Sequence, residues 1–221
     1  MGHASAIANA HPCTCHPGLD PGSTEPSKQS LFRRRTPMSD IPDWAQTARD
    51  SWQWRGARRP DFAVAPGPGQ VSVWDFPRPP KVVLDTREVV VRWGDTEVCR
   101  TSRPVMVLET SHPPTFYLPW ADVARHLLQP AGGGSVCEWK GPAKYWTLHD
   151  GSRQLPKVAW SYPNPMAGAE PIADCVAFYA ESLQCTVDGE MVRPQPGGFY
   201  GGWITPELVG PFKGEPGSAG W

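Results

Sequence analysis

Three short hairpin patterns constrain the fold of this chain more than any other feature of its sequence. In each pattern, two runs rich in β-branched, aromatic and other strand-forming residues flank a tight turn that contains glycine. Glycine accepts the positive φ that such turns require. The strand pairs are 88–93 with 96–100, 146–149 with 153–155, and 184–187 with 190–192. Antiparallel β structure is therefore predicted from Lys81 onward.

Further segments complete a prediction of a mainly β fold with one main helix. The stretch 120–128 carries an apolar stripe of helical period and ends before a proline and three glycines, so we predict the main helix there. Shorter helices are predicted at 44–50 and at 206–209. Additional strands are expected at 105–108, 115–118 and 176–179.

Size and charge exclude several classes of protein. The 221 residues suit one ordinary domain. A formal net charge of −1 gives no strong nucleic-acid signal, because binding through many phosphates needs a basic excess. No run approaches the ~20 apolar residues that cross a bilayer, so no membrane partner is expected. The oligomeric state and any cofactor stay unknown at this stage.

The six cysteines indicate a reducing compartment. None belongs to a C-x-x-C pair, and they are spread too widely for the framework of a small secreted domain. The N-terminus also lacks the charged and apolar regions of a secretory signal. We therefore expect reduced thiols and a cytoplasmic location.

The chain divides into three regions by composition. Residues 1–37 are interpreted as a disordered leader or a mis-assigned start, so the folded protein is expected to begin near Met38. The pattern His-Pro-Cys-Thr-Cys-His at 11–16 is too tight for a tetrahedral metal site, and no metal site is predicted. Residues 38–80 hold the short helix and an N-terminal wrapping arm rich in tryptophan and proline. Residues 81–221 form the β domain and its glycine-rich C-terminal tail.

The arm cannot be a helix or a central strand, because its prolines remove backbone donors. Five aromatic residues alternate with these prolines between Trp52 and Pro80. We expect the aromatic rings to dock on the β domain. Aromatic ladders also bind single-stranded nucleic acid, but here the positive charge that accompanies them is missing.

The segment Cys137-Glu138-Trp139-Lys140-Gly141 is the densest candidate for chemistry. In an extended strand Cys137 and Lys140 point to opposite faces, so they meet only if the backbone turns near Gly141. An ammonium beside Cys137 would favour the nucleophilic thiolate. The alternative is a buried free cysteine beside a surface ion pair.

Glu109 is a candidate general acid or base. It shares a predicted strand face with Val105 and Val107, and a carboxylate on an apolar face is either paired or shifted in pKa. His112 follows in a Ser-His-Pro-Pro sequence and is interpreted as an exposed turn residue. Asp95 and Glu97 have the spacing of a two-metal nucleotidyl-transfer site, but turn chemistry explains them better because they sit at a predicted hairpin tip.

Aromatic residues from separate segments form the remaining candidates. Trp160 and Tyr162 lie on one strand face. With Tyr117 and Tyr145 they could line an apolar pocket that holds a few polar groups, the usual form of a small-ligand site. The alternative is an aromatic core.

Six motifs that occur in order between Trp52 and Trp221 closely resemble the bacterial family called domain of unknown function 427. They are Trp74-Asp75-Phe76-Pro77-Arg78-Pro79-Pro80, Leu108-Glu109-Thr110-Ser111-His112-Pro113-Pro114, Tyr117-Leu118-Pro119 with Asp122-Val123, Cys137-Glu138-Trp139-Lys140-Gly141, Ala159-Trp160-Ser161-Tyr162-Pro163 and Gly198-Phe199-Tyr200-Gly201-Gly202-Trp203.

This resemblance implies a single β-tent-like domain, similar to methionine-sulfoxide reductase B and the Mss-four-like zinc proteins. The paired C-x-x-C zinc ligands of many such relatives are missing here. The family is sometimes labelled nucleotidyltransferase-like. A β-tent could gather Glu109, Tyr117, Lys140, Tyr145, Trp160 and Tyr162 in one cleft.

Two functions follow from these observations. The first is a small-molecule cleft that is also a candidate catalytic site, in which Glu109 is the acid or base, Lys140 holds an anionic group or orients Glu109, and Cys137 is a third catalytic candidate. Tyr117, Tyr145, Trp160 and Tyr162 would form its wall. The alternative is a non-catalytic binding or protein-interaction module that uses the arm and the C-terminal tail.

Overall fold

The computed structural model describes residues 41–221, which form a mainly β domain with one α-helix, α1 (Asp43–Asp50). The predictions of a mainly β fold and of a short helix near 44–50 are confirmed. The expectations for residues 1–37 and for a start near Met38 lie outside the described residues. None of the helices within 41–221 has the length and apolar character needed to cross a membrane.

The largest sheet has seven strands in the order β2-β5-β6-β12-β11-β10-β7, all paired antiparallel, and it is open at both edges. It contains the three additional predicted strands and the second predicted hairpin. Its members are β2 (Lys81–Leu84), β5 (Val105–Leu108), β6 (Thr115–Pro119), β7 (Leu128–Pro130), β10 (Lys144–His149), β11 (Gln154–Ser161) and β12 (Cys175–Phe178).

The other two predicted hairpins join in a second sheet of four strands, because β13 pairs with β3. Its members are β3 (Val89–Trp93), β4 (Thr96–Thr101), β13 (Gln184–Val187) and β14 (Glu190–Met191). Three two-stranded sheets complete the fold. They pair β1 (Val71–Ser72) with β17 (Leu208–Val209), β8 (Val136–Cys137) with β9 (Gly141–Pro142), and β15 (Arg193–Pro194) with β16 (Trp203–Ile204).

Strand alternation divides the buried side chains between the two faces of the seven-stranded sheet. On β6, Phe116 and Leu118 pack into the main core with residues of the four-stranded sheet, whereas Tyr117 points to the opposite face. On β11, Ala159 belongs to the main core and its neighbour Trp160 to the opposite face. One face therefore holds the main core, and the other face is left for an aromatic cluster.

The predicted helix at 120–128 is wrong. Two short 3-10 turns, Trp120–Asp122 and Arg125–Leu127, stand there and lead into β7. The amide of Ala124 donates to the carbonyl of Val98 on β4 at 2.8 Å, so the backbone pairs across the fold instead of along a helix. The apolar stripe still marks core positions, because Val123 and Leu128 are buried.

The predicted helix at 206–209 is also wrong, because this backbone pairs with a strand of the arm in a two-stranded sheet. A turn closes where the amide of Leu208 donates to the carbonyl of Thr205 at 3.0 Å. Strand β17 then pairs in parallel with β1, and the amide of Val71 donates to the carbonyl of Glu207 at 2.8 Å. The competing partner lies more than a hundred residues away, so no local pattern indicates it.

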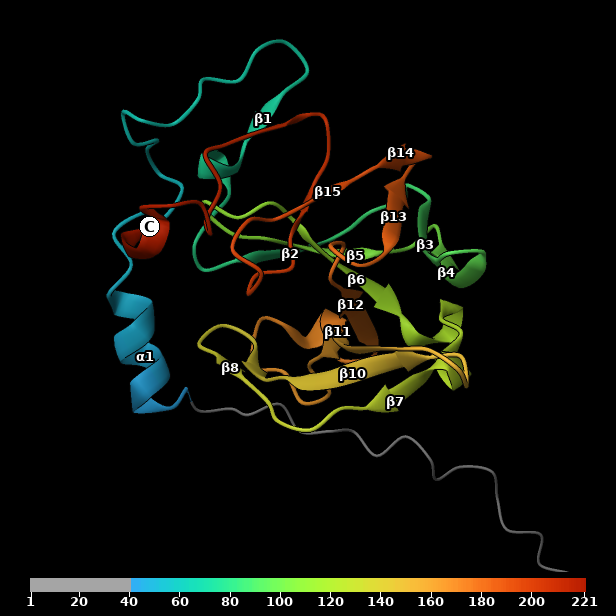
Figure 1. The fold of residues 1–221 in the computed structure, drawn as a ribbon. Coiled ribbons are helices and arrows are strands. Elements are labelled where there is room, and N and C mark those ends of the chain that lie inside the picture. Colours follow the sequence, from blue (N-terminus) through green and yellow to red (C-terminus); the bar gives the residue numbers. More distant parts are fainter. Residues whose placement is uncertain (1–40) are drawn as a thin grey trace, which may run out of the picture. The chain divides into compact units, whose positions relative to one another are not determined.

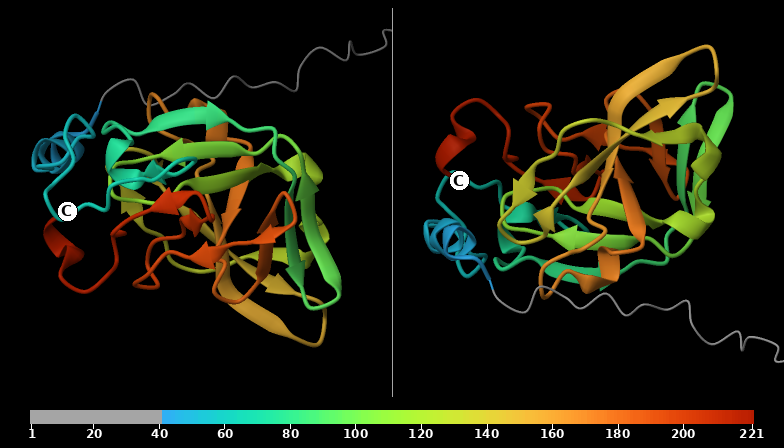
Figure 2. Two further views of the ribbon diagram at one scale, coloured as in Figure 1. Left: turned by 90° about the horizontal axis from the view of Figure 1, so that it is seen from above. Right: turned by 90° about the horizontal axis from the view of Figure 1, so that it is seen from below.

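The arm docks through its aromatic rings on the C-terminal segment. Trp74 is fully buried and packs edge-on against Trp54, Phe62 and Trp221, at 6.0, 5.2 and 5.3 Å between ring centroids. Figures 1 and 2 show α1 and the C-terminal turn on the same side of the domain, away from the β3–β4 hairpin. The predicted wrapping arm is therefore part of the packed structure.

Candidate functional site

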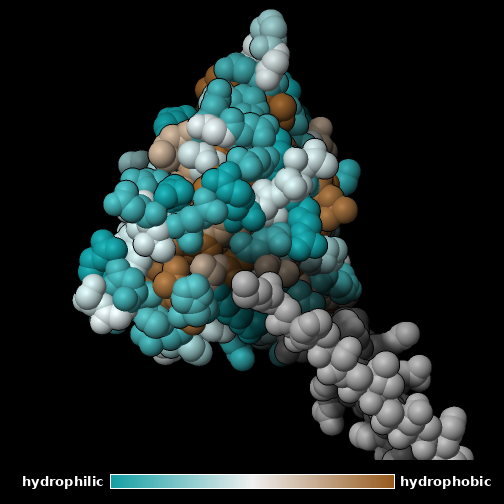
Figure 3. Space-filling view, turned by 90° about the vertical axis from the view of Figure 1, so that its right-hand side faces the viewer, coloured by the Kyte–Doolittle hydropathy of each residue, from teal (hydrophilic) through white to brown (hydrophobic). Residues whose placement is uncertain are grey.

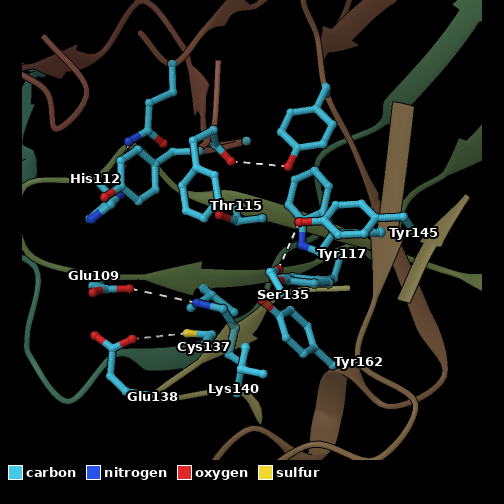
Figure 4. Close-up of a pocket in the computed structure, with 18 of the residues that line it drawn as sticks. Glu109, His112, Thr115, Tyr117, Ser135, Cys137, Glu138, Lys140, Tyr145 and Tyr162 are labelled. Carbon is cyan, nitrogen blue, oxygen red and sulfur yellow. Dashed lines mark hydrogen bonds and ion pairs between the residues drawn. The ribbon is translucent and has the colours of Figure 1, made fainter. Parts of the chain in front are cut away.

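A cavity of about 190 Å³ opens on the aromatic face of the seven-stranded sheet. Figure 4 shows its lining, in which charged side chains gather at one end and tyrosine rings at the other. All the candidate residues named from the sequence line this cavity: Glu109, Lys140, Cys137, Tyr117, Tyr145, Trp160 and Tyr162.

The aromatic end of the cavity is positioned by the register of the sheet. Tyr145 on β10 is the pairing partner of Trp160 on β11, so both rings project from the same face. Tyr117 on β6 lies near them, with its ring centroid 6.4 Å from Trp160 and 6.3 Å from Tyr162. Tyr179, which follows β12, packs 4.5 Å from Trp160.

Two glycines of the C-terminal segment close the wall behind Trp160. An added Cβ at Gly201 would overlap the indole ring of Trp160, and one at Gly202 would overlap Gln195 and Pro113. The glycine-rich sequence therefore permits close packing on an aromatic ring.

The charged end depends on the short β8–β9 hairpin. The chain reverses over 138–140, between the paired residues Cys137 and Gly141, and Gly141 takes a φ of +90°. This turn places Lys140 and Cys137 on one cavity, as the predicted bend required. The Nζ of Lys140 lies 3.8 Å from Oε2 of Glu109, and it makes no hydrogen bond with any residue of the described region.

Glu109 is held from its other side by Arg78, whose side chain is fully buried. The Nε and Nη2 of Arg78 lie 3.3 and 3.2 Å from Oε1 of Glu109. The same guanidinium donates at 3.0 Å to each of the carbonyls of Trp54 and Thr110, and it stacks 4.2 Å from the ring of Trp52. These contacts fix the carboxylate and leave Oε2 facing the cavity.

The positive neighbours keep Glu109 ionised. Burial alone would raise the pKa of Glu109. The charges of His112 in its protonated form, of Lys140 and of Arg78 outweigh burial and keep the pKa of Glu109 below its usual value. Burial lowers the pKa of His112 to about 4, so the imidazole is neutral at pH 7 and the positive charge comes from Lys140 and Arg78. Glu109 is therefore a hydrogen-bond acceptor at neutral pH.

Lys140 stays protonated in this setting. Burial would lower the pKa of Lys140, but its acidic neighbours Cys137, Tyr117, Glu109 and Tyr162 raise the pKa well above the usual value. Of these groups only Glu109 is ionised at neutral pH, because burial raises the pKa of Tyr117 to about 12 and also raises the pKa of Tyr162. Lys140 is thus a charged donor.

Of the two interpretations of Cys137, the structure supports the buried free cysteine and not the thiolate. Burial raises the pKa of Cys137, and the opposing effect of Lys140 does not compensate. The thiol instead donates to Oε2 of Glu138 at 3.7 Å. Cys137 therefore contributes a neutral thiol to the cavity.

His112 lies in a turn as predicted, since its amide donates to the carbonyl of Glu109 at 3.0 Å, but the predicted exposure is wrong, because the side chain is half-buried and lines the cavity. Its Nδ1 lies 2.9 Å from Nε2 of Gln195, which also donates to the carbonyl of Lys213 at 2.9 Å. Gln195 is buried and accepts from the amide of Gly202. The C-terminal segment holds His112 inside, and no pattern near His112 indicates this.

Several residues of the arm also reach the site. Trp52 lines the cavity and donates from Nε1 to Oε1 of Glu138 at 2.8 Å. Arg49 on α1 donates to the carbonyl of Glu138 at 2.8 Å and stacks on Trp139 at 4.7 Å. The aromatic residues of the arm predicted docking, but they carried no signal for these partners.

One buried polar group at the aromatic end lacks a partner. The hydroxyl of Tyr117 makes no hydrogen bond within the part of the chain that the structure describes. The indole N–H of Trp160 is close enough to the Tyr117 hydroxyl to oppose the rise in the pKa of Tyr117. The two groups do not have the geometry of a hydrogen bond.

Other candidates for metal chemistry lie elsewhere. Glu97 pairs with Arg92 and Arg100 at the exposed β3–β4 hairpin, and neither Asp95 nor Glu97 lines the cavity. Across residues 41–221, no group of three or more His, Cys, Asp or Glu side chains is placed to hold a metal ion.

Comparison with known proteins supports the resemblance seen in the motifs. Residues 81–193, just over half of the chain, match a family model described as "Domain of unknown function (DUF427)", whose name also carries the nucleotidyltransferase label. No curated protein matches the chain. Four of the six motifs lie within this match, which leads to one identification: the chain belongs to the DUF427 family.

Proposed function

We propose that the cavity beside Glu109 and Lys140 binds a small polar molecule. Its volume of about 190 Å³ is below the ~300 Å³ at which pockets for drug-sized ligands begin, so the ligand is small. Tyr117, Tyr145, Trp160 and Tyr162 supply the apolar wall, and Glu109 and Lys140 supply the polar contacts.

One observation carries this proposal. The side chain of Lys140 is only 13% exposed, yet its ammonium makes no hydrogen bond among residues 41–221 and is 3.8 Å from its one ion-pair partner there. A largely buried charged donor is stabilised when hydrogen-bond acceptors replace the water that it has lost. A folded protein tolerates such a group where a ligand or water completes its contacts.

The geometry supports different roles for the three candidate catalytic residues. Glu109 is ionised and held by Arg78, so it suits the role of hydrogen-bond acceptor or general base and not that of general acid. Lys140 orients the acceptor groups of the ligand. Cys137 contributes a neutral thiol to the wall, and its protonated state disfavours nucleophilic attack.

The alternative, a protein-interaction module, requires a broad exposed aromatic patch. The arm instead turns Trp54 and Trp74 inward onto the C-terminal segment, and Phe62 stacks on Trp221. Figure 3 draws the side of the β3–β4 hairpin, away from the arm, and polar residues predominate on it. The inward packing of the arm's rings favours the cavity.

We further propose a cytoplasmic location. Cys99, Cys137, Cys175 and Cys185 are all free thiols, as expected in a reducing compartment.

The test is a thermal-shift screen of the full-length protein against a panel of small metabolites, followed by calorimetry on each hit. Lys140→Met should abolish binding of the hits, because it removes the unsatisfied donor while keeping the apolar chain length. Lys144→Met is the matched control, since Lys144 is exposed on the adjacent strand β10. If every hit binds Lys140→Met as tightly as the parent protein, the cavity is not the binding site.

A further inference from the structure

We propose that the ligand of this cavity is uncharged where it meets Glu109 and Lys140, and that it presents an N–H next to a C=O, as the edge of a cyclic amide does. This inference rests on the proposed function and specifies the chemical class of the ligand.

The first reason for this ligand class is that Oε2 of Glu109 and Nζ of Lys140 are both available to bond a ligand. Oε1 of Glu109 is occupied by Arg78, but Oε2 makes no hydrogen bond in the described part of the chain. The Nζ of Lys140, 3.8 Å away, also makes none. Figure 4 shows the two side chains pointing toward one another at the edge of the cavity. An acceptor therefore stands beside a donor, and the complementary ligand has a donor beside an acceptor.

The second reason is that opposite charges stand side by side at this end of the cavity, which disfavours a charged ligand. A ligand anion near Lys140 would also lie near the carboxylate of Glu109, and a ligand cation near Glu109 would lie near the ammonium. Arg78 and Glu138 add one further charge of each sign at this end, so attraction and repulsion of a charged ligand largely cancel. A charged ligand would still lose its hydration on entry. A neutral ligand keeps both hydrogen bonds without that loss.

The third reason is that the aromatic wall and the size of the cavity favour a small, flat ligand. The rings of Trp160 and Tyr179 are tilted by 42° with their centroids 4.5 Å apart, and Tyr145 pairs with Trp160 across the strands. Each of these aromatic faces can stack on a flat ring of the ligand. The cavity volume of about 190 Å³ suits one or two fused rings. A planar cyclic amide meets the size, flatness and hydrogen-bonding requirements together.

The experiment compares rings of similar size that differ in the groups at one edge. The full-length protein is titrated with 2-pyridone, N-methyl-2-pyridone, phenol, benzoate and benzamidine, and affinity is measured by NMR or calorimetry. We expect 2-pyridone to bind at least about tenfold more tightly than the other four, because each lacks the donor, lacks the neighbouring acceptor or carries charge.

The results separate the ligand class from the proposed function. If benzoate, benzamidine or phenol binds the cavity as tightly as 2-pyridone, the proposal of a cyclic amide ligand is wrong. The proposal that the cavity binds a small molecule is then unaffected. If N-methyl-2-pyridone binds equally well, the predicted contact with Glu109 is wrong. If none of the five binds, the class is wrong, and the metabolite panel decides the proposed function independently.

A variant tests the origin of the selectivity. Lys140→Met leaves Glu109 ionised, because Arg78 still holds it. The preference should then change from 2-pyridone to the cation benzamidine, whereas Lys144→Met should keep the parent preference. An unchanged order of affinities in Lys140→Met would overturn the inference. If that variant does not fold, the ligand series on the parent protein still decides.

Discussion

The two ends of the cavity are built in different ways. The aromatic end comes from neighbouring strands of one sheet, where pairing places Tyr145 opposite Trp160. The charged end comes from three segments that do not pair with one another: the arm supplies Arg78, the end of β5 leads to Glu109, and the β8–β9 hairpin supplies Lys140.

This difference shows which interactions hold each end in place. The aromatic end is supported by sheet register and packing, so single changes there should have local and moderate effects. The charged end depends on a buried ion pair, and removing one partner leaves the other as an uncompensated buried charge. We therefore expect larger losses of stability at the charged end.

The largest effect is expected for Arg78→Met. The substitution removes the buried partner of Glu109 and two hydrogen bonds to backbone carbonyls, so the free energy of unfolding should fall by about 3–5 kcal/mol. Urea denaturation measures this loss. Arg59→Met breaks an exposed pair with Asp75 and should cost far less, because solvent screens the pair. Equal losses of unfolding free energy in the two variants would contradict the expectation that the charged end of the cavity depends on its buried ion pair.

A pH-dependent loss should come next in size. Burial lowers the pKa of His112 from 6.5 to about 4, so between these values the unfolded chain binds a proton that the folded protein does not. Stability should therefore fall by up to about 3 kcal/mol as the pH drops from 6.5 to 4. The lowered pKa of Glu109 adds a loss only at still lower pH.

Denaturation curves at several pH values test this prediction with two variants. His112→Asn should flatten the dependence between pH 6.5 and 4, because it removes the titrating group. His126→Gln should leave the dependence unchanged, since His126 is exposed. A slope that survives in His112→Asn would show that another group titrates.

A moderate effect is expected at the aromatic end for Gly201→Ala. The new methyl group would overlap the ring of Trp160, and overpacking of this kind costs about 1–3 kcal/mol. Gly132→Ala is the matched control, because an added Cβ there meets nothing within 4 Å. Tryptophan fluorescence together with urea denaturation would detect both the displaced ring and the loss. A stability equal to that of the control would mean that the wall is loosely packed.

The smallest effects are expected for two tyrosine hydroxyls in the same wall. Tyr117→Phe removes a buried hydroxyl without a hydrogen-bond partner in the described region, so stability should stay the same or rise slightly. Tyr145→Phe removes a hydrogen bond of 2.8 Å with Ser135 and should cost about 1 kcal/mol. Thermal unfolding compares the two variants. A larger loss for Tyr117→Phe would show that its hydroxyl has a partner in solution.

Much of the fold and of the candidate site was predictable from local patterns. The turns at Gly94-Asp95 and Asp188-Gly189 lie between paired strands as expected. The apolar face that Glu109 shares with Val105 and Val107 predicted a paired carboxylate, and the position of Lys140 near Cys137 predicted an ammonium in the site; both side chains line one cavity. Their roles in binding or catalysis remain predictions.

The failures share one physical cause, which is competition from distant partners. The stretch 120–128 has a helical pattern, but its backbone bonds to β4. His112 has the sequence of a surface loop, but Gln195 of the C-terminal segment binds its ring. Neither partner lies within the window of residues from which a local pattern is read.

The order of residues alone thus determined the antiparallel hairpins and the apolar and aromatic positions, because turn conformation and strand alternation are local properties of the chain. Tertiary structure alone decided which charges meet. Arg78 pairs with Glu109 across 31 residues, and Lys140 approaches the same carboxylate from a separate hairpin. Such pairs depend on how the segments pack, since burial makes an ion pair strong and packing decides which charges are buried together.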